Sequence, residues 1–112
     1  MKGILIDPWE KRVSSIEVDK GLGALYDAMD CSCVTTPISF ENRDSLFMDD
    51  EGRFRDNAFW EFEDPRGQVW QFVGKGLILG TDEEGDSESA RSELEDIKER
   101  CTFTPFLLRA TN

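Results

Sequence analysis

The sequence contains no histidine, which removes the side chain on which most proton-transfer chemistry near neutral pH depends. Hydrolytic triads and most general-base mechanisms use an imidazole, so a serine or cysteine nucleophile would lack its usual partner here. A catalytic pair of serine and lysine remains possible in principle, but no sequence motif indicates one. We therefore expect a protein that is not an enzyme and that has no catalytic residues.

Cysteine and long apolar runs are also scarce. Three cysteines are an odd number, which argues against a complete disulfide framework. No stretch reaches the roughly 20 apolar residues of a membrane span, and residues 1–7 lack the length and cleavage site of a signal peptide. We therefore expect a cytoplasmic protein with reduced thiols and no membrane partner. Cys31, Cys33 and Cys101 do not follow the usual zinc-ligand spacing, so we expect them to be packed or half-exposed thiols.

Two acidic segments, Asp82–Asp86 and Asp49–Gly52, raise the question of calcium. An EF-hand loop needs glycine at its sixth position. That position is Ser87 if the loop begins at Asp82 and Phe54 if it begins at Asp49, so neither register fits. Solvated turns are the favoured interpretation, and we expect no metal and no cofactor. A small metal- or ligand-binding protein remains an alternative.

Two further patterns could suggest contact with phosphates or nucleic acid. Gly74-Lys75-Gly76 lacks the residue order of a phosphate-binding loop, and a close backbone approach at the head of a strand explains the glycines better. Aromatic side chains on strands can stack on bases, but such platforms sit in basic grooves. Here the aromatic residues have acidic neighbours, so core packing is favoured and no nucleic-acid partner is expected. The aromatic residues concerned are Trp60, Phe62, Trp70 and Phe72.

The chain has 112 residues, which suits a single domain over 1–112. Hydrophobic periodicity predicts an α+β fold, with one mostly antiparallel sheet of about five to six strands and two helices on one face. Pro37 predicts that its own strand lies at an edge or is bent. The expected strands are 3–7, 11–18, 31–40, 44–49, 58–63, 68–73 and 77–79, the expected helices run from 19 or 20 to 29 and from 92 onward, and 103–108 is expected to be extended.

The most secure local element is a hairpin around Asp64-Pro65-Arg66-Gly67, because proline second and glycine fourth fit a type I turn. Ser92-Glu93-Leu94-Glu95 has the form of a capping box and predicts a helix start at Ser92. The apolar positions of the expected elements predict a core of Ile4, Ile6, Leu25, Phe47, Trp60, Phe62, Trp70, Phe72, Leu77, Leu79, Leu94 and Ile97.

Charge is the least ordinary feature of the composition. The chain has 24 acidic and 13 basic residues, a formal net charge of −11. Such a charge keeps a protein soluble, repels phosphates and attracts basic surfaces. Residues 82–99 hold nine acids and two bases, and this stretch is either a solvated loop and helix face or a surface that imitates DNA. The predicted partner-binding residues are Asp82, Glu83, Glu84, Asp86, Glu88, Glu93, Glu95, Asp96 and Glu99.

Three sequence segments carry a family resemblance: Ile4–Pro8, Leu46–Gly52 and, as the most specific of them, Gly74–Gly85. In this order they resemble small acidic proteins of unknown function from bacteriophages and plasmids of Gram-negative bacteria, over residues 1 to about 102. The resemblance implies a mobile-element origin and a host-cytoplasm location, and it brings no catalytic residues. Together with the charge, it suggests a non-enzymatic binder or inhibitor of a basic host protein, of the anti-defence or host-takeover type. A structural or oligomerisation module, pairing through a strand such as Cys31–Phe40, is a further alternative.

Overall fold

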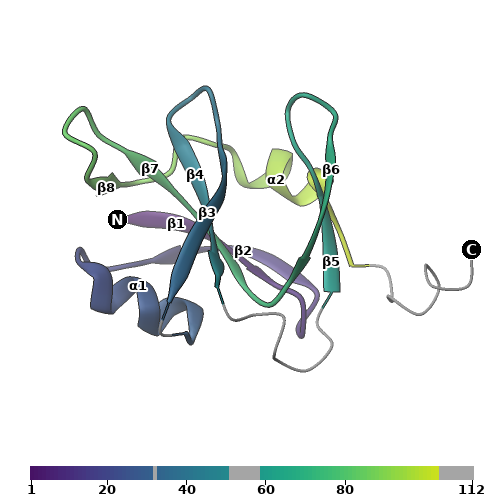
Figure 1. Cartoon of the computed structure of the whole chain (residues 1–112), viewed down its shortest axis with the longest axis horizontal. Coiled ribbons are helices and arrows are strands. Elements are labelled where there is room, and N and C mark those ends of the chain that lie inside the picture. The colour runs from purple at the N-terminus through teal and green to yellow at the C-terminus, as the bar shows by residue number, and fades with distance from the viewer. Residues whose placement is uncertain (32, 51–58, 104–112) are drawn as a thin grey trace, which may run out of the picture.

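A computed structural model describes residues 1–31, 33–50 and 59–103 of the chain (Figure 1). Strands dominate these residues, and two short helices accompany them. In chain order the elements are β1 (Lys2–Asp7), β2 (Arg12–Glu17), α1 (Leu22–Met29), β3 (Val34–Ser39), β4 (Asp44–Asp49), β5 (Phe59–Glu63), β6 (Val69–Val73), β7 (Gly76–Thr81), β8 (Ser87–Glu88), α2 (Leu94–Arg100) and β9 (Cys101–Thr102).

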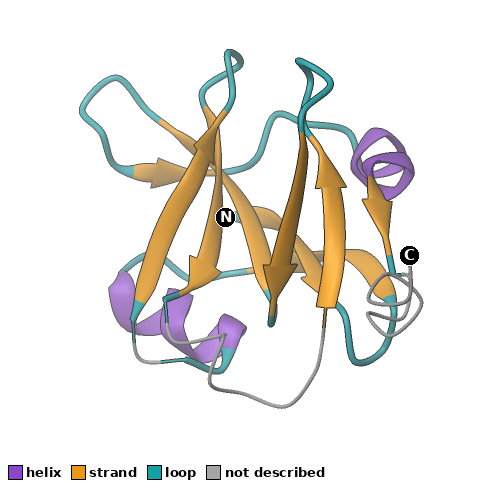
Figure 2. Cartoon of the chain, turned by 45° about the vertical axis from the view of Figure 1, so that its right-hand side comes forward, coloured by secondary structure: helices purple, strands orange, loops and turns teal. Residues whose placement is uncertain are grey.

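The strands form two sheets, so the expectation of a single sheet is wrong (Figure 2). The large sheet has the order β2-β1-β7-β4-β3, with β8 paired to β7, and the small sheet has the order β6-β5-β9. Every pairing between these strands is antiparallel. Residues 51–58 separate β4 from β5 in the sequence, and the small sheet begins with β5.

The two helices pack against different apolar clusters, so the prediction that both lie on one face is also wrong. Strand β7 shows why, because its consecutive apolar residues point alternately to the two faces of the large sheet. Leu77 and Leu79 pack with Leu25 and Met29 of α1. Ile78 points the other way, into a cluster that contains Trp60 of β5 and Ile97 of α2. The large sheet is therefore covered by α1 on one face and by the small sheet with α2 on the other.

The structure buries most of the residues that the hydrophobic pattern predicted for the core. Of the predicted core residues, Phe47, Trp70, Phe72 and Leu94 are only partly buried, although each packs against one of the two clusters. The others are buried: Ile4, Ile6, Leu25, Trp60, Phe62, Leu77, Leu79 and Ile97. Buried apolar residues outside the prediction are Val13, Val18, Met29, Ile38, Leu46, Met48 and Ile78.

The hairpins agree with the sequence. Strands β1 and β2 pair from Lys2↔Glu17 to Asp7↔Arg12. Strands β5 and β6 place Trp60 opposite Phe72 and Phe62 opposite Trp70, as their turn predicts. Strand β3 is an edge of the large sheet, and its register shifts between Thr35 and Ile38 around the proline, as expected. Pairing between chains through the edge strand β3, the alternative of an oligomerisation module, stays a prediction.

The helix starts differ from expectation. Helix α1 begins only at Leu22, because Gly21 has a φ of 110°, outside the helical region. Helix α2 begins at Leu94 after Glu93, with no side-chain cap, so the predicted capping box is wrong. Ser92 instead donates its hydroxyl to the carboxylate of Asp44. Segment 104–112, which contains most of the predicted last extended segment, lies outside the described residues.

Close packing explains the glycine at the head of β7. A Cβ atom on Gly76 would lie 3.0 Å from Cζ2 of Trp60 and 3.1 Å from Leu46 and Met48. The carbonyl oxygen of Gly74 accepts the indole N–H of Trp60 at 2.8 Å. The Gly-Lys-Gly segment is therefore a place of close backbone approach, as the structural interpretation of the sequence predicted.

Candidate functional site

A cleft in the described part of the chain lies between the tips of two hairpins and beside α2. It has a volume of about 540 Å³ and is lined by residues 37–42 of the β3–β4 hairpin, by the β5–β6 turn with Trp70, and by Ser92, Asp96, Ile97 and Arg100. Figure 1 shows the two hairpin tips next to each other at the top of the molecule, with α2 close by. A volume of this size is typical of ligand pockets, which makes the cleft the candidate binding site.

A buried carboxylate, Asp64, shapes one wall of the cleft. Its Oδ1 accepts the backbone N–H groups of Arg66 and Gln68 at 2.9 and 3.0 Å, which fixes the turn. Its Oδ2 accepts the indole N–H of Trp70 at 3.0 Å. The ring of Trp70 also stacks on Phe72, with ring centroids 6.0 Å apart. The aromatic side of the cleft is therefore held in place before any ligand arrives.

The same contacts lower the pKa of Asp64 below its usual 3.8. The hydrogen bond from Trp70 is the largest cause, burial opposes it, and the N–H groups of Gln68 and Arg66 and the charge of Arg66 add to it. A lowered folded-state pKa stabilises the fold above the unfolded value, and this contribution is lost as the pH falls through the folded value. Wild type and Asp64→Asn should therefore differ most in free energy of unfolding above pH 3.8, with the gap narrowing in more acidic solution.

Urea denaturation of both proteins over a series of pH values measures this difference. Asp86→Asn is the control, because the exposed Asp86 side chain accepts no hydrogen bond in the described part of the chain. A gap between wild type and Asp64→Asn that stays constant down to the most acidic pH would contradict the lowered pKa.

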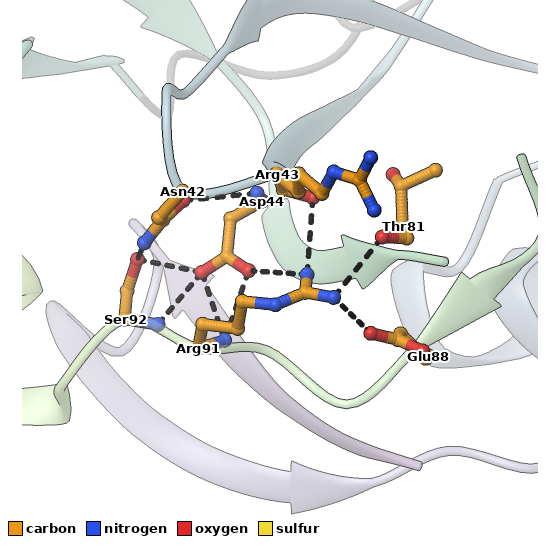
Figure 3. Close-up of polar contacts among 7 residues, drawn as sticks. All are labelled: Asn42, Arg43, Asp44, Thr81, Glu88, Arg91 and Ser92. Atoms are coloured by element: carbon orange, nitrogen blue, oxygen red, sulfur yellow. Dashed lines mark hydrogen bonds and ion pairs between the residues drawn. The ribbon is translucent and has the colours of Figure 1, made fainter. Parts of the chain in front are cut away.

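A second buried carboxylate, Asp44, holds the other wall (Figure 3). Its side chain is completely buried. It accepts the backbone N–H of Arg91 at 2.9 and 3.0 Å, the backbone N–H of Ser92 at 2.7 Å and the Ser92 hydroxyl at 2.6 Å. Asn42 completes the arrangement, since its oxygen accepts the backbone N–H of Asp44 and its amide donates to Ser92 Oγ at 3.1 Å. These contacts tie the β3–β4 turn to the segment that leads into α2.

The guanidinium of Arg91 extends this network to β7 and β8. It lies 3.8 Å from the Asp44 carboxylate, donates to the carbonyl oxygen of Thr81 at 3.2 Å, and pairs with Glu88. The backbones come so close here that a Cβ on Gly80 would lie 2.5 Å from the carbonyl oxygen of Ser89. The network therefore joins four segments of the chain around one buried charge.

Charged side chains line the cleft itself. Glu41 and Arg66 face each other from the two hairpin tips at 3.9 Å, with 91% and 81% of their side chains exposed. Arg100 donates from Nε to Asp96 at 3.1 Å and from Nη1 to the carbonyl oxygen of Glu63 at 3.2 Å. The tip-to-tip pair is weak because water surrounds it, whereas Arg100 is held at two points.

The structure separates the nine predicted partner-binding residues into two groups. One group, on the left of Figure 1, lies in the β7–β8 turn and β8, and the other, farther to the right, lies in or next to α2. The first group is Asp82, Glu83, Glu84 and Asp86 in the turn with Glu88 in β8, and the second is Glu93, Glu95, Asp96 and Glu99. Three of the nine pair with cations: Glu88 with Arg91, Glu95 with Lys98, and Asp96 with Arg100. The nine carboxylates therefore do not form one continuous surface.

Local roles account for part of this acidic stretch. Asp82 accepts the backbone N–H groups of Glu84 and Asp86, both at 2.9 Å, and so closes its own turn. Glu95 and Asp96 lie in the first turn of α2, where a negative charge stabilises a helix. In the described part of the chain, Glu83, Glu84, Glu93 and Glu99 form no ion pair. These exposed side chains remain the candidates for contact with a partner.

Two of the three cysteines lie on opposite faces of the large sheet. Cys31 packs with the α1 cluster, and Cys101 packs with the cluster on the opposite face of the large sheet. Burial raises the pKa of the Cys101 thiol to about 12, so it stays protonated at neutral pH. Among the described residues, no group of three or more cysteine, aspartate and glutamate side chains is placed to hold a metal ion.

Neither Asp44 nor the cleft was predicted from the sequence. Asp44 belongs to no motif, and its partners follow almost fifty residues later, so only the fold brings them together. Asp64 did carry a signal, since aspartate at the first position of a type I turn often accepts backbone N–H groups of that turn.

Comparisons with known proteins complete the description of the chain. No described helix is long and apolar enough to cross a membrane. No curated protein and no solved structure matches the chain. One family model does match, over residues 1–102, and it describes a domain of unknown function. The prediction of a family of unknown function is confirmed to that extent, while the phage or plasmid origin stays a prediction. The chain belongs to this family, the domain of unknown function DUF3846.

Proposed function

We propose that this protein is a non-enzymatic binder of a basic protein, and that it docks through α2 and the adjoining cleft. In this proposal the protein is a phage- or plasmid-encoded factor, and it acts on a host defence or transcription component in the cytoplasm. The observation that carries the proposal is the position of exposed carboxylates beside a preformed cleft. Glu93 immediately before α2 and Glu99 within it are exposed, and Glu41 and Asp96 line the cleft itself.

Charge gives this surface a physical reason to attract a basic partner. The formal net charge of −11 produces a negative field around the whole molecule, which speeds the approach of a positive surface. Charge alone does not orient a partner, however. The cleft supplies fixed walls beside the helix, since Asp64 holds the β5–β6 turn and Asp44 holds the segment before α2. The β7–β8 turn has exposed acids but does not line the cleft.

The experiment compares two charge-reversed proteins in affinity capture from a bacterial lysate. One carries Glu93→Lys with Glu99→Lys, and the other carries Glu83→Lys with Glu84→Lys. Both add the same charge, and none of the four side chains has an ion partner in the described part of the chain. Wild type should retain a basic protein that elutes as salt is raised, because salt screens contacts between exposed charges.

The α2 variant should lose at least about tenfold in affinity for that protein, because charge reversal creates like-charge contacts with the partner. The turn variant should bind within about threefold of wild type, since it alters only the long-range field. Mass spectrometry identifies the retained protein, and titration with the purified protein measures both affinities. Equal loss of binding in the two variants would show that the position of the charge is unimportant. Retention of no salt-sensitive basic protein by wild type would remove the proposal itself.

A further inference from the structure

We infer that the cleft receives one cationic side chain, arginine or lysine, from the surface of the basic partner. This inference rests on the proposed function and adds the point at which the partner is anchored. The observation behind it is that Trp70, Glu41 and Asp96 line one cleft of about 540 Å³. An aromatic ring together with carboxylates is a chemical environment that stabilises a guanidinium or ammonium group.

The balance of charge in the cleft favours a cation over an anion. Its lining contains three carboxylates, Glu41, Asp64 and Asp96, and two guanidinium groups, Arg66 and Arg100. The lining is therefore net negative, and it belongs to a chain that is itself strongly negative. An anionic group entering the cleft would be repelled by this field, whereas a cationic group would be attracted.

The carboxylates differ in their readiness to accept a new donor. The oxygens of Asp64 already accept three N–H groups, so this residue shapes the wall and adds to the field. Asp96 shares its charge with Arg100. Glu41 is the most available, because its contact with Arg66 is 3.9 Å long and fully exposed to water. Such a pair contributes little free energy, so an entering cation can replace Arg66 at small cost.

The two guanidinium groups are less suited to hold a ligand of their own. Arg100 is directed by Asp96 and by the carbonyl oxygen of Glu63. Arg66 extends into water from the hairpin tip. The partly buried Trp70 is different, since its indole N–H is fixed by Asp64 and its ring by Phe72. A ring that is already ordered loses little entropy when a cation settles against it.

The test uses the indole signals of the three tryptophans in the ¹⁵N-labelled full chain, titrated with a hexa-arginine peptide at low salt. The Trp70 signal should shift and reach saturation, because its N–H lies in the wall of the cleft. The Trp60 signal should stay in place, because its N–H is buried against the carbonyl oxygen of Gly74. The Trp9 signal reports on an exposed turn outside the cleft.

Matched variants separate the cleft from the general field. Glu41→Gln should weaken hexa-arginine binding about threefold, the size expected for one exposed charge pair. Glu84→Gln removes the same charge from the β7–β8 turn, outside the cleft, and should have the smaller effect. Equal effects of the two variants, or a Trp70 shift produced equally by hexa-glutamate, would overturn the inference.

The outcomes also distinguish this inference from the proposed function. If the Trp70 signal stays fixed while the backbone N–H signals of Glu93 and Glu99 shift, arginine binds along α2 without entering the cleft. The anchoring inference then fails and the proposed function stands. If no signal shifts at low salt, the acidic surface does not attract cations at all, and both fail.

Discussion

Replacing Asp44 with alanine should lower the free energy of unfolding by about 3–5 kcal/mol, the range for removing one partner from a buried charged network. The completely buried carboxylate of Asp44 accepts the N–H groups of Arg91 and Ser92 and the Ser92 hydroxyl. Its removal leaves these donors without an acceptor in the interior, and the guanidinium of Arg91 loses its nearest buried charge. Urea denaturation followed by circular dichroism measures the change.

Two further substitutions show whether this loss belongs to the network. Ser92→Ala removes only the hydroxyl from the group around Asp44, with its hydrogen bonds to Asp44 and from Asn42, and should cost about 1–2 kcal/mol. Asp86→Ala removes an exposed carboxylate and should change the stability by less than about 0.5 kcal/mol. If Asp44→Ala were as mild as Asp86→Ala, the carboxylate would not be the centre that joins these segments.

The Asp44 network also bears on binding, because it fixes the approach to α2. Ser92 and Asn42 both line the cleft, and both are held through Asp44. Asp64 does the same for the opposite wall. Each wall of the cleft is therefore held by a buried carboxylate, while the exposed carboxylates remain available to a partner. The acidic residues of this chain thus divide between shaping the site and presenting charge.

Local elements of the fold could be predicted because their signals are short-range. The Asp64–Gly67 turn specifies its own hairpin, and the register of that hairpin then pairs Trp60 with Phe72. Pro37 cannot donate a backbone hydrogen bond, so its strand was predicted to lie at an edge or to be bent, and β3 is an edge strand with a register shift around the proline. In each case the deciding chemistry lies within a few residues of the element.

The arrangement of these elements could not be predicted in the same way. The run Leu77-Ile78-Leu79 shows only that β7 is apolar on both faces, and it does not say which element covers each face. The division into two sheets depends on long-range pairings such as Glu61↔Thr102, which leave no periodic pattern in the sequence. The capping box at Ser92 failed for a related reason, since Asp44 takes the hydroxyl that the motif assigned to the helix.

Trp60→Ala should be the other most damaging substitution, with a loss of about 3–5 kcal/mol in the free energy of unfolding. Trp60 is 1% exposed and lies between the sheets. Its ring packs so closely on the large sheet that a Cβ added to Gly76 would lie 3.0 Å from Cζ2 of Trp60. On the small sheet its ring centroid is 5.1 Å from that of Phe72. Truncation leaves a cavity at this contact and removes the N–H that binds the carbonyl oxygen of Gly74.

The control is Trp9→Ala, because Trp9 is 48% exposed in the β1–β2 turn and donates its backbone N–H, which alanine keeps, to the carboxylate of Asp7. It should cost less than about 1 kcal/mol, and urea denaturation followed by circular dichroism compares the two variants without relying on tryptophan fluorescence. Similar losses in both variants would mean that Trp60 does not join the two sheets. A selective loss would show that the small sheet, which carries Trp70 and one wall of the cleft, depends on this contact for its position.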